Sequence, residues 1–279
     1  MRALQTDYQM KYRTKSILLW ILSFILMAAA AIYQRATGPT YPERGKVEIA
    51  GETIKYKLIR TWEGSTDAEI TVEVENNDIK GKYRFKRYKS YDTWSEKPME
   101  RRGDELIAYL PGQPAAGKVE YEIYLGTDGE FSKLEEEPLI LRYKGVVPQF
   151  VLIPHIIIIF LAMMFSARTG IEALINGRNL VKYSLWTLIL LTVGGMIFGP
   201  IVQKYAFDAY WTGWPFGQDL TDNKTLLAWV MWIAAYFQVR NNPNKKGWVI
   251  AASVVLLLVY LIPHSMFGSE IDFREQAVN

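Results

Sequence analysis

The sequence predicts a membrane α-helical bundle of about five helices, with an all-β domain inserted between the first and second of them. Residues 16–33 and 146–263 are mostly apolar, and their charged side chains gather in short connecting stretches. Residues 34–145 are polar instead, and much of that stretch alternates apolar and polar side chains, as half-buried strands do. These two populations divide the chain into a membrane part and a soluble part.

The first membrane-spanning helix is expected over residues 16–33, because about twenty apolar residues are needed to cross the hydrocarbon of a bilayer. Residues 1–15, which precede it, are basic. A cleaved signal peptide is the alternative, since the small residues at 28–31 resemble a cleavage site. The apolar run is long for a signal peptide, so we favour an uncleaved anchor.

The remaining spans are expected in the four-helix region 146–263, which carries an outer loop at 203–224. Their approximate limits are 146–166, 183–202, 225–239 and 248–263.

The direction of the spans follows from lysine and arginine in the short loops, which collect on the cytoplasmic side. The connection after the second span, in which we place Arg168, is basic, and so is the connection after the fourth. With five spans, both lie on the side of residues 1–15. We therefore expect a cytoplasmic N-terminus in a bacterial inner (plasma) membrane. The domain 34–145, the loop 203–224 and the tail 264–279 are then outside.

The domain 34–145 is expected to contain about seven short strands separated by turn residues. They are placed at 46–50, 53–60, 68–75, 82–88, 106–110, 118–125 and 139–143. This number and spacing is typical of an immunoglobulin-like or fibronectin-like sandwich, and Gly117 followed by Tyr121 fits the tyrosine corner of such folds. A basic run at 80–89 is interpreted as a solvated face; docking of acidic partners or anionic lipid is the alternative.

Candidate ligands for a cofactor are few, because the chain has no cysteine and only two histidines, His155 and His264. Disulfides, iron–sulfur clusters and thiolate metal sites are therefore excluded. Both histidines are expected near the outer surface, His155 inside the second span and His264 at the end of the fifth. An ionisable residue within a span is costly and is a functional candidate. Together they can hold haem b or a divalent metal; the alternative is that His155 packs as a neutral residue and His264 lies at the interface.

Acidic residues on the outer side complete the candidate metal set, because carboxylates together with imidazoles suit a divalent cation. They are Asp208, Asp219, Asp222, Glu270 and Asp272. Their spacing matches no established metal motif. The loop 203–224 is rich in tryptophan, tyrosine and glycine, which predicts a position in the membrane interface, with a lid over a pocket as the alternative. Asp219 or Asp222 is expected to cap the fourth span.

The sequence favours a non-catalytic accessory or structural subunit of a membrane complex, with a periplasmic binding or spacer domain. No nucleophile, general base or phosphate-binding loop stands out in it. The expected partners are the bilayer and other membrane or periplasmic subunits, and not nucleic acid. One alternative is a haem- or metal-binding electron-transfer protein that uses His155 and His264. The other, ranked last because the spans offer few polar residues, is a small transporter.

Overall fold

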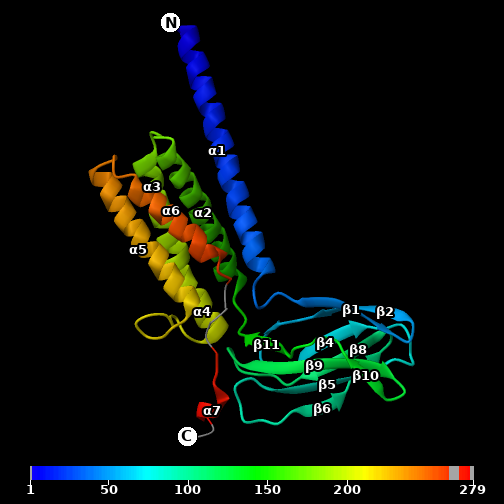
Figure 1. The fold of residues 1–279 in the computed structure, drawn as a ribbon. Coiled ribbons are helices and arrows are strands. Elements are labelled where there is room, and N and C mark those ends of the chain that lie inside the picture. The colour runs from blue at the N-terminus through cyan, green and yellow to red at the C-terminus, as the bar shows by residue number, and fades with distance from the viewer. Residues whose placement is uncertain (1, 264–269, 277–279) are drawn as a thin grey trace. The chain divides into compact units, whose positions relative to one another are not determined.

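The computed structural model describes residues 2–263 and 270–276 of the chain and divides it into two compact units (Figure 1). The helical unit comprises Met1–Gly38, Val147–Lys204 and Ala209–Gly268. The β-rich unit comprises Pro39–Val146, Tyr205–Asp208 and Ser269–Asn279.

The helices of the described chain follow the apolar stretches of the sequence. They are α1 (Arg2–Ala36), α2 (Gln149–Leu174), α3 (Leu180–Leu191), the π-helical segment η1 (Thr192–Phe198), α4 (Gly199–Phe207), α5 (Leu220–Asn241), α6 (Gly247–Leu261) and the short α7 (Phe273–Gln276). In the helical unit α2 packs against α1, α3 and α6, and α5 packs against α3 and α6.

Within the described residues, three helical stretches are long and apolar enough to cross a membrane. They are Arg13–Ala36 in α1, Gln149–Leu174 in α2, and Leu180–Phe207, which joins α3, η1 and α4. Helix α6 is apolar but shorter. Association with a membrane is therefore possible on the length and composition of these helices.

The end of α2 differs from the sequence expectation, because the helix continues past residue 166 and includes Arg168, which we had placed in a loop. Arg168 Nη1 donates a hydrogen bond to Glu172 Oε2 at 2.6 Å, and both side chains are only 2% exposed. The guanidinium group also lies 5.1 Å from the ring centre of Tyr183 and 5.6 Å from that of Trp20. A partner one turn along the helix neutralises the charge, so Arg168 is buried in the bundle.

Small residues let the helices approach closely at several points. A β-carbon added at Gly195 would lie 3.0 Å from Thr225 Cγ2 of α5, and one at Gly170 would lie 2.9 Å from Ser253 Cβ of α6. At Gly199 the nearest atom would be 3.7 Å away. Helices of this chain therefore approach each other closely at Gly195 and at Gly170.

The β-rich unit contains three sheets in the part of the chain that is described. Its strands are β1 (Glu43–Ile49), β2 (Glu52–Leu58), β3 (Thr61–Glu63), β4 (Ala68–Glu73), β5 (Lys80–Arg87), β6 (Ser95–Pro98), β7 (Glu100–Arg102), β8 (Glu105–Leu110), β9 (Lys118–Thr127), β10 (Glu130–Lys133) and β11 (Leu139–Lys144). One sheet pairs β1 with β2, a second has the order β4-β8-β7, and the largest has the order β3-β11-β9-β5-β6 with β10 paired to β9. The β3–β11 pair is parallel, and the other pairs are antiparallel.

Each strand predicted from period-two alternation is present, and the strands that the sequence did not predict are three or four residues long. Too few residues alternate in such short strands to give a signal. The inward side chains of all three sheets meet in one hydrophobic core, which includes Ile54, Ile70 and Leu141. The hydroxyl of Tyr121 donates to Ile59 O at 2.6 Å, far away in the sequence. The predicted tyrosine corner, whose hydroxyl bonds a few residues upstream, is therefore wrong.

The basic run on β5 is paired with carboxylates on neighbouring strands. Its ion pairs, with the nitrogen–oxygen distances, are Lys82–Glu96 (3.2 Å), Arg84–Glu122 (2.6 Å) and Lys86–Glu120 (3.0 Å). Cross-strand pairs of opposite charge stabilise a sheet and leave little net field. For Lys82, Arg84 and Lys86 this arrangement favours the interpretation as a solvated face.

The pair Arg168–Glu172 provides a stability prediction. Replacing Arg168→Met should lower the free energy of unfolding by about 3–5 kcal/mol, because it leaves the Glu172 carboxylate buried without its counter-charge. The double variant Arg168→Met/Glu172→Gln should recover most of that loss, since glutamine keeps an acceptor for the Asn179 amide that binds Glu172 Oε1 at 2.9 Å. Unfolding of the full chain in mixed micelles, followed by tryptophan fluorescence, measures both. An equal loss in the single and double variants would contradict the ion-pair argument.

Candidate functional site

The connection between α4 and α5 folds back on the first turn of α5. Asp219 is the N-cap of that helix, and its carboxylate accepts hydrogen bonds from Thr221 N at 2.7 Å and from Asp222 N at 3.3 Å. An acidic N-cap satisfies free amide groups and complements the helix dipole. The predicted cap of the fourth span is thus confirmed for Asp219.

Asp222 binds the connecting loop instead of capping α5. Its buried carboxylate accepts hydrogen bonds from Thr212 N at 2.7 Å, Gly213 N at 3.0 Å and Gln203 Nε2 at 3.1 Å. A β-carbon at Gly213 would lie 2.5 Å from Asp222 Cβ, so a glycine is required there. The carboxylate is occupied by protein donors, and its role in this geometry is to fix the loop on α5.

Lys224 and Gln34 bind the end of α6. Lys224 Nζ donates to Ile262 O at 2.6 Å, and Gln34 Nε2 donates to Tyr260 O at 2.5 Å. The last carbonyl groups of a helix have no partner within it, and a cation there also complements the dipole. Neither contact is predicted by the sequence, because single polar side chains at the edges of apolar runs are typical of any membrane interface.

Aromatic side chains of the same loop are exposed. Tyr210, Trp214 and Phe216 are 61%, 69% and 82% exposed in the folded chain. Tryptophan and tyrosine side chains are common at the boundary between a membrane and water. Their exposure agrees with the proposed position of this loop in the membrane interface.

His155 has a backbone partner inside the helical unit. Its Nδ1 lies 3.0 Å from Gly194 O of the π-helical segment η1. If Nδ1 carries the proton and donates to this carbonyl, Nε2 keeps its lone pair. His264 lies outside the described residues, so a site shared by the two histidines stays a prediction.

The acidic residues of the candidate metal set are divided between the two units. Asp219 and Asp222 belong to the helical unit, whereas Asp208, Glu270 and Asp272 belong to the β-rich unit. Asp272 pairs with Arg274 at 2.5 Å. In the described chain no group of three or more histidine, aspartate or glutamate side chains is arranged to hold a metal ion. The metal site therefore also stays a prediction, because His264 is not among these residues.

The described C-terminal segment, residues 270–276, is bound on the β-rich unit, and we call it the tail segment. The Glu270 carboxylate accepts hydrogen bonds from the ammonium groups of Lys89 and Lys118. The backbone is held as well, because Ile271 N donates to Ala116 O at 3.3 Å.

The aromatic residue of the tail segment completes this contact. Phe273 is buried, and the Arg87 guanidinium lies 4.7 Å from its ring centre. The amide of Arg274 donates to Lys89 O at 3.2 Å. The tail segment is therefore held on the β-rich unit by charge pairs, backbone hydrogen bonds and a buried ring.

The charges at this contact act on each other. Burial raises the pKa of Glu270, but hydrogen bonds from Lys118 and Lys89 and their positive charges outweigh burial and lower it below its usual value. Because the folded state lowers this pKa, the contact contributes its full stability above the ordinary glutamate pKa of about 4.3. That contribution is lost as the pH falls through the lowered value.

The comparisons with known proteins add no name to these sites. Neither the protein-family models nor the curated proteins contain a match to this chain.

The tail contact should respond to pH and to charge. Hydrogen exchange at the amides of Ile271 and Arg274, corrected for intrinsic rate, should be slow at pH 7 and should accelerate as the pH falls below about 4.3. In the Glu270→Gln variant these two amides should exchange fast at neutral pH. In the Glu275→Gln variant, which changes an exposed position, they should exchange as in the wild type. Slow exchange in Glu270→Gln would show that the ion pairs do not hold the segment.

Proposed function

We propose that this chain is a multi-pass membrane protein that serves as a non-catalytic accessory or structural subunit of a membrane complex. Its β-rich unit, an immunoglobulin-like or fibronectin-like sandwich, is the domain that binds the partner outside the membrane. The observation that carries this proposal is the tail segment on that unit. A domain that holds an acidic peptide in its own chain has the lysines, backbone groups and ring site that a similar partner segment requires.

The same contact supports the arrangement with five spans. The tail segment and the β domain touch within one unit, so both lie on the same side of a membrane. The chain between Gly145 and Glu270 must then cross an even number of times. Helix α2 and the run α3–α4 are long and apolar enough for two crossings. If both cross, α5 and α6 either both cross or both stay on one side.

The ends of α5 and α6 favour a pair of crossings. Lys224, in the first turn of α5, binds the carbonyl of Ile262 at the end of α6, so the two helices form an antiparallel pair. The 22 residues of α5 rise about 33 Å, enough for a hydrocarbon layer of about 30 Å. We propose that α5 runs to the cytoplasmic side and that α6 returns, with the N-terminus cytoplasmic and the C-terminus outside a bacterial inner membrane.

An electron-transfer protein that binds haem b or a metal is the alternative, and one contact of His155 favours it. Histidines that bind a metal commonly donate their second ring N–H to a backbone carbonyl, as His155 Nδ1 is placed to do toward Gly194 O. The visible spectrum and the metal content of the purified protein distinguish the two functions. A chromophore or metal that is lost in both His155→Ala and His264→Ala would replace the accessory-subunit proposal.

Reporter fusions test the topology. Fusions after Lys144 and after Asn279 should report the outside, and a fusion at Asn244, between α5 and α6, should report the cytoplasm because α5 has crossed. An outside result at Asn244 would mean that neither α5 nor α6 crosses. An inside result after Asn279 would contradict the even number of crossings.

A synthetic peptide tests the binding role. The peptide of residues 269–276 should bind in trans to a chain that ends at Gly268, and binding should weaken as salt screens the two lysines. The same peptide with Glu270→Lys is the matched control, and it should bind at least about tenfold more weakly, since it places like charges together. Equal binding of both peptides, or of neither, would contradict a peptide-binding surface.

A further inference from the structure

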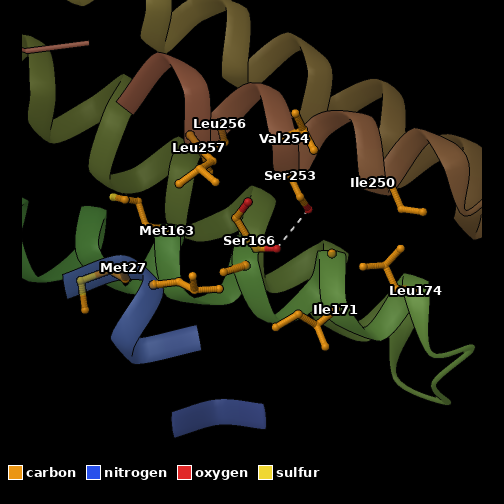
Figure 2. A pocket seen from close by; sticks show the side chains of 13 residues that line it. Met27, Met163, Ser166, Ile171, Leu174, Ile250, Ser253, Val254, Leu256 and Leu257 are labelled. Carbon is orange, nitrogen blue, oxygen red and sulfur yellow. Dashed lines mark hydrogen bonds between the residues drawn. The ribbon is translucent and has the colours of Figure 1, made fainter. Parts of the chain in front are cut away.

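A groove of about 180 Å³ runs along α2 between α1 and α6 (Figure 2). Figure 2 shows Met27 and Met163 at one end and Leu174 and Ile250 at the other. The lining is apolar apart from two serines. They are Ser166 and Ser253, and the hydroxyl group of Ser253 donates a hydrogen bond to the backbone carbonyl of Ser166 at 3.0 Å. The lining is therefore mostly hydrocarbon.

The groove arises because α1 crosses α2 obliquely. Near its C-terminal half, Met27 and Ala30 of α1 pack in one cluster with Met163 of α2 and Tyr260 of α6. Closer to its N-terminus, Trp20 of α1 packs on the other flank of α2, with its ring centre 5.5 Å from that of Tyr183 in α3. Helix α1 therefore diverges from α6 along α2, and the space between α1 and α6 is the groove.

The walls of this groove are open to the side. Leu26, Leu174, Val254 and Leu257 line it and are 41%, 64%, 49% and 40% exposed. For helices embedded in a bilayer, that side faces lipid chains. An apolar cavity of about 150 Å³ is large enough to hold one benzene molecule, so this groove has room for a short length of a single acyl chain.

One end of the groove carries a positive charge. Lys246 precedes the first turn of α6, and its Nζ donates to Asn176 Oδ1, just beyond the end of α2. Ile250, which lines the groove, follows one turn later. The helix dipole at the start of α6 adds to the lysine charge. A phosphate group at this end is therefore complementary in charge to the protein.

We propose that this groove is a binding site for one anionic glycerophospholipid, with an acyl chain along α2 and the phosphate at Lys246. The lipid site rests on the proposal that the helical unit is embedded in a membrane. Experiment can distinguish a failure of the lipid site from a failure of the membrane proposal. A full chain that does not float with vesicles fails the membrane proposal. A chain that enters vesicles but binds no lipid in the groove fails the groove alone.

Photocrosslinking in vesicles is the first test. A phosphatidylglycerol probe with a diazirine in its acyl chain should crosslink the full chain at residues that line the groove. Ala167→Leu, which fills the floor, should lower the yield about tenfold, whereas Ala251→Leu, an exposed alanine of α6 outside the groove, should not. An unchanged yield in Ala167→Leu, or crosslinks spread evenly over the helices, would overturn the site.

The head-group contact is tested by charge. Lys246→Gln should weaken labelling by the phosphatidylglycerol probe, and Lys245→Gln, whose side chain bonds Gln238, should leave it unchanged. A phosphatidylcholine probe of the same chain should label the wild type more weakly. Equal labelling by the two probes would overturn the anionic specificity.

A second readout does not depend on a substitution that fills the groove. The chain has no cysteine, so a fluorophore on Val254→Cys reports the groove and one on Leu258→Cys reports the exposed surface of α6 outside it. In detergent micelles, phosphatidylglycerol with brominated chains should quench Val254→Cys with saturation near one lipid per protein. Leu258→Cys should be quenched in proportion to total lipid. The same concentration dependence at both positions would overturn the site.

Discussion

The helical unit depends on one constraint: burying a polar group costs free energy unless the group finds a partner within the protein. The ends of the helices are where this is hardest, since several amide and carbonyl groups there have no partner in the helix itself. Asp219 binds the amides at the start of α5, Asp222 binds amides of the aromatic loop, and Lys224 and Gln34 bind carbonyls at the end of α6. These contacts tie α1, α5, α6 and the aromatic loop to one another at one end of the bundle.

The same constraint explains the buried charges and the histidine. Arg168 is stable inside the bundle because Glu172 lies one turn away and aromatic rings surround the guanidinium group. His155 reaches a carbonyl of the π-helical segment, where the widened turn brings Gly194 O within 3.0 Å of its ring. Arg168 thus has its partner on its own helix and His155 has one on a neighbouring element, which makes these residues supports of the packing as well as candidates for chemistry.

In the β-rich unit, charge is used differently on two surfaces. On β5, Lys82, Arg84 and Lys86 each face a carboxylate of an adjacent strand, so this face carries little net field. At the tail contact, Lys89 and Lys118 share the single carboxylate of Glu270, which leaves a net positive site once the tail segment departs. Positive and negative charges balance on the β5 face, whereas positive charge is in excess at the tail contact. For this reason the tail contact, and not the β5 face, is proposed to bind a partner.

The sequence by itself determined the division into apolar helices and a β-rich domain, the approximate helix limits, the strands of six or more residues and the acidic cap of α5, because these follow from local periodicity and composition. Only the tertiary structure decided that Arg168 is buried against Glu172, that Tyr121 bonds Ile59, that Lys224 binds the end of α6, and that Glu270 lies between Lys89 and Lys118. Apart from the Arg168–Glu172 pair, these contacts join residues far apart in the chain. A local pattern carries no information about such contacts, because the pairing is chosen by which apolar faces pack together.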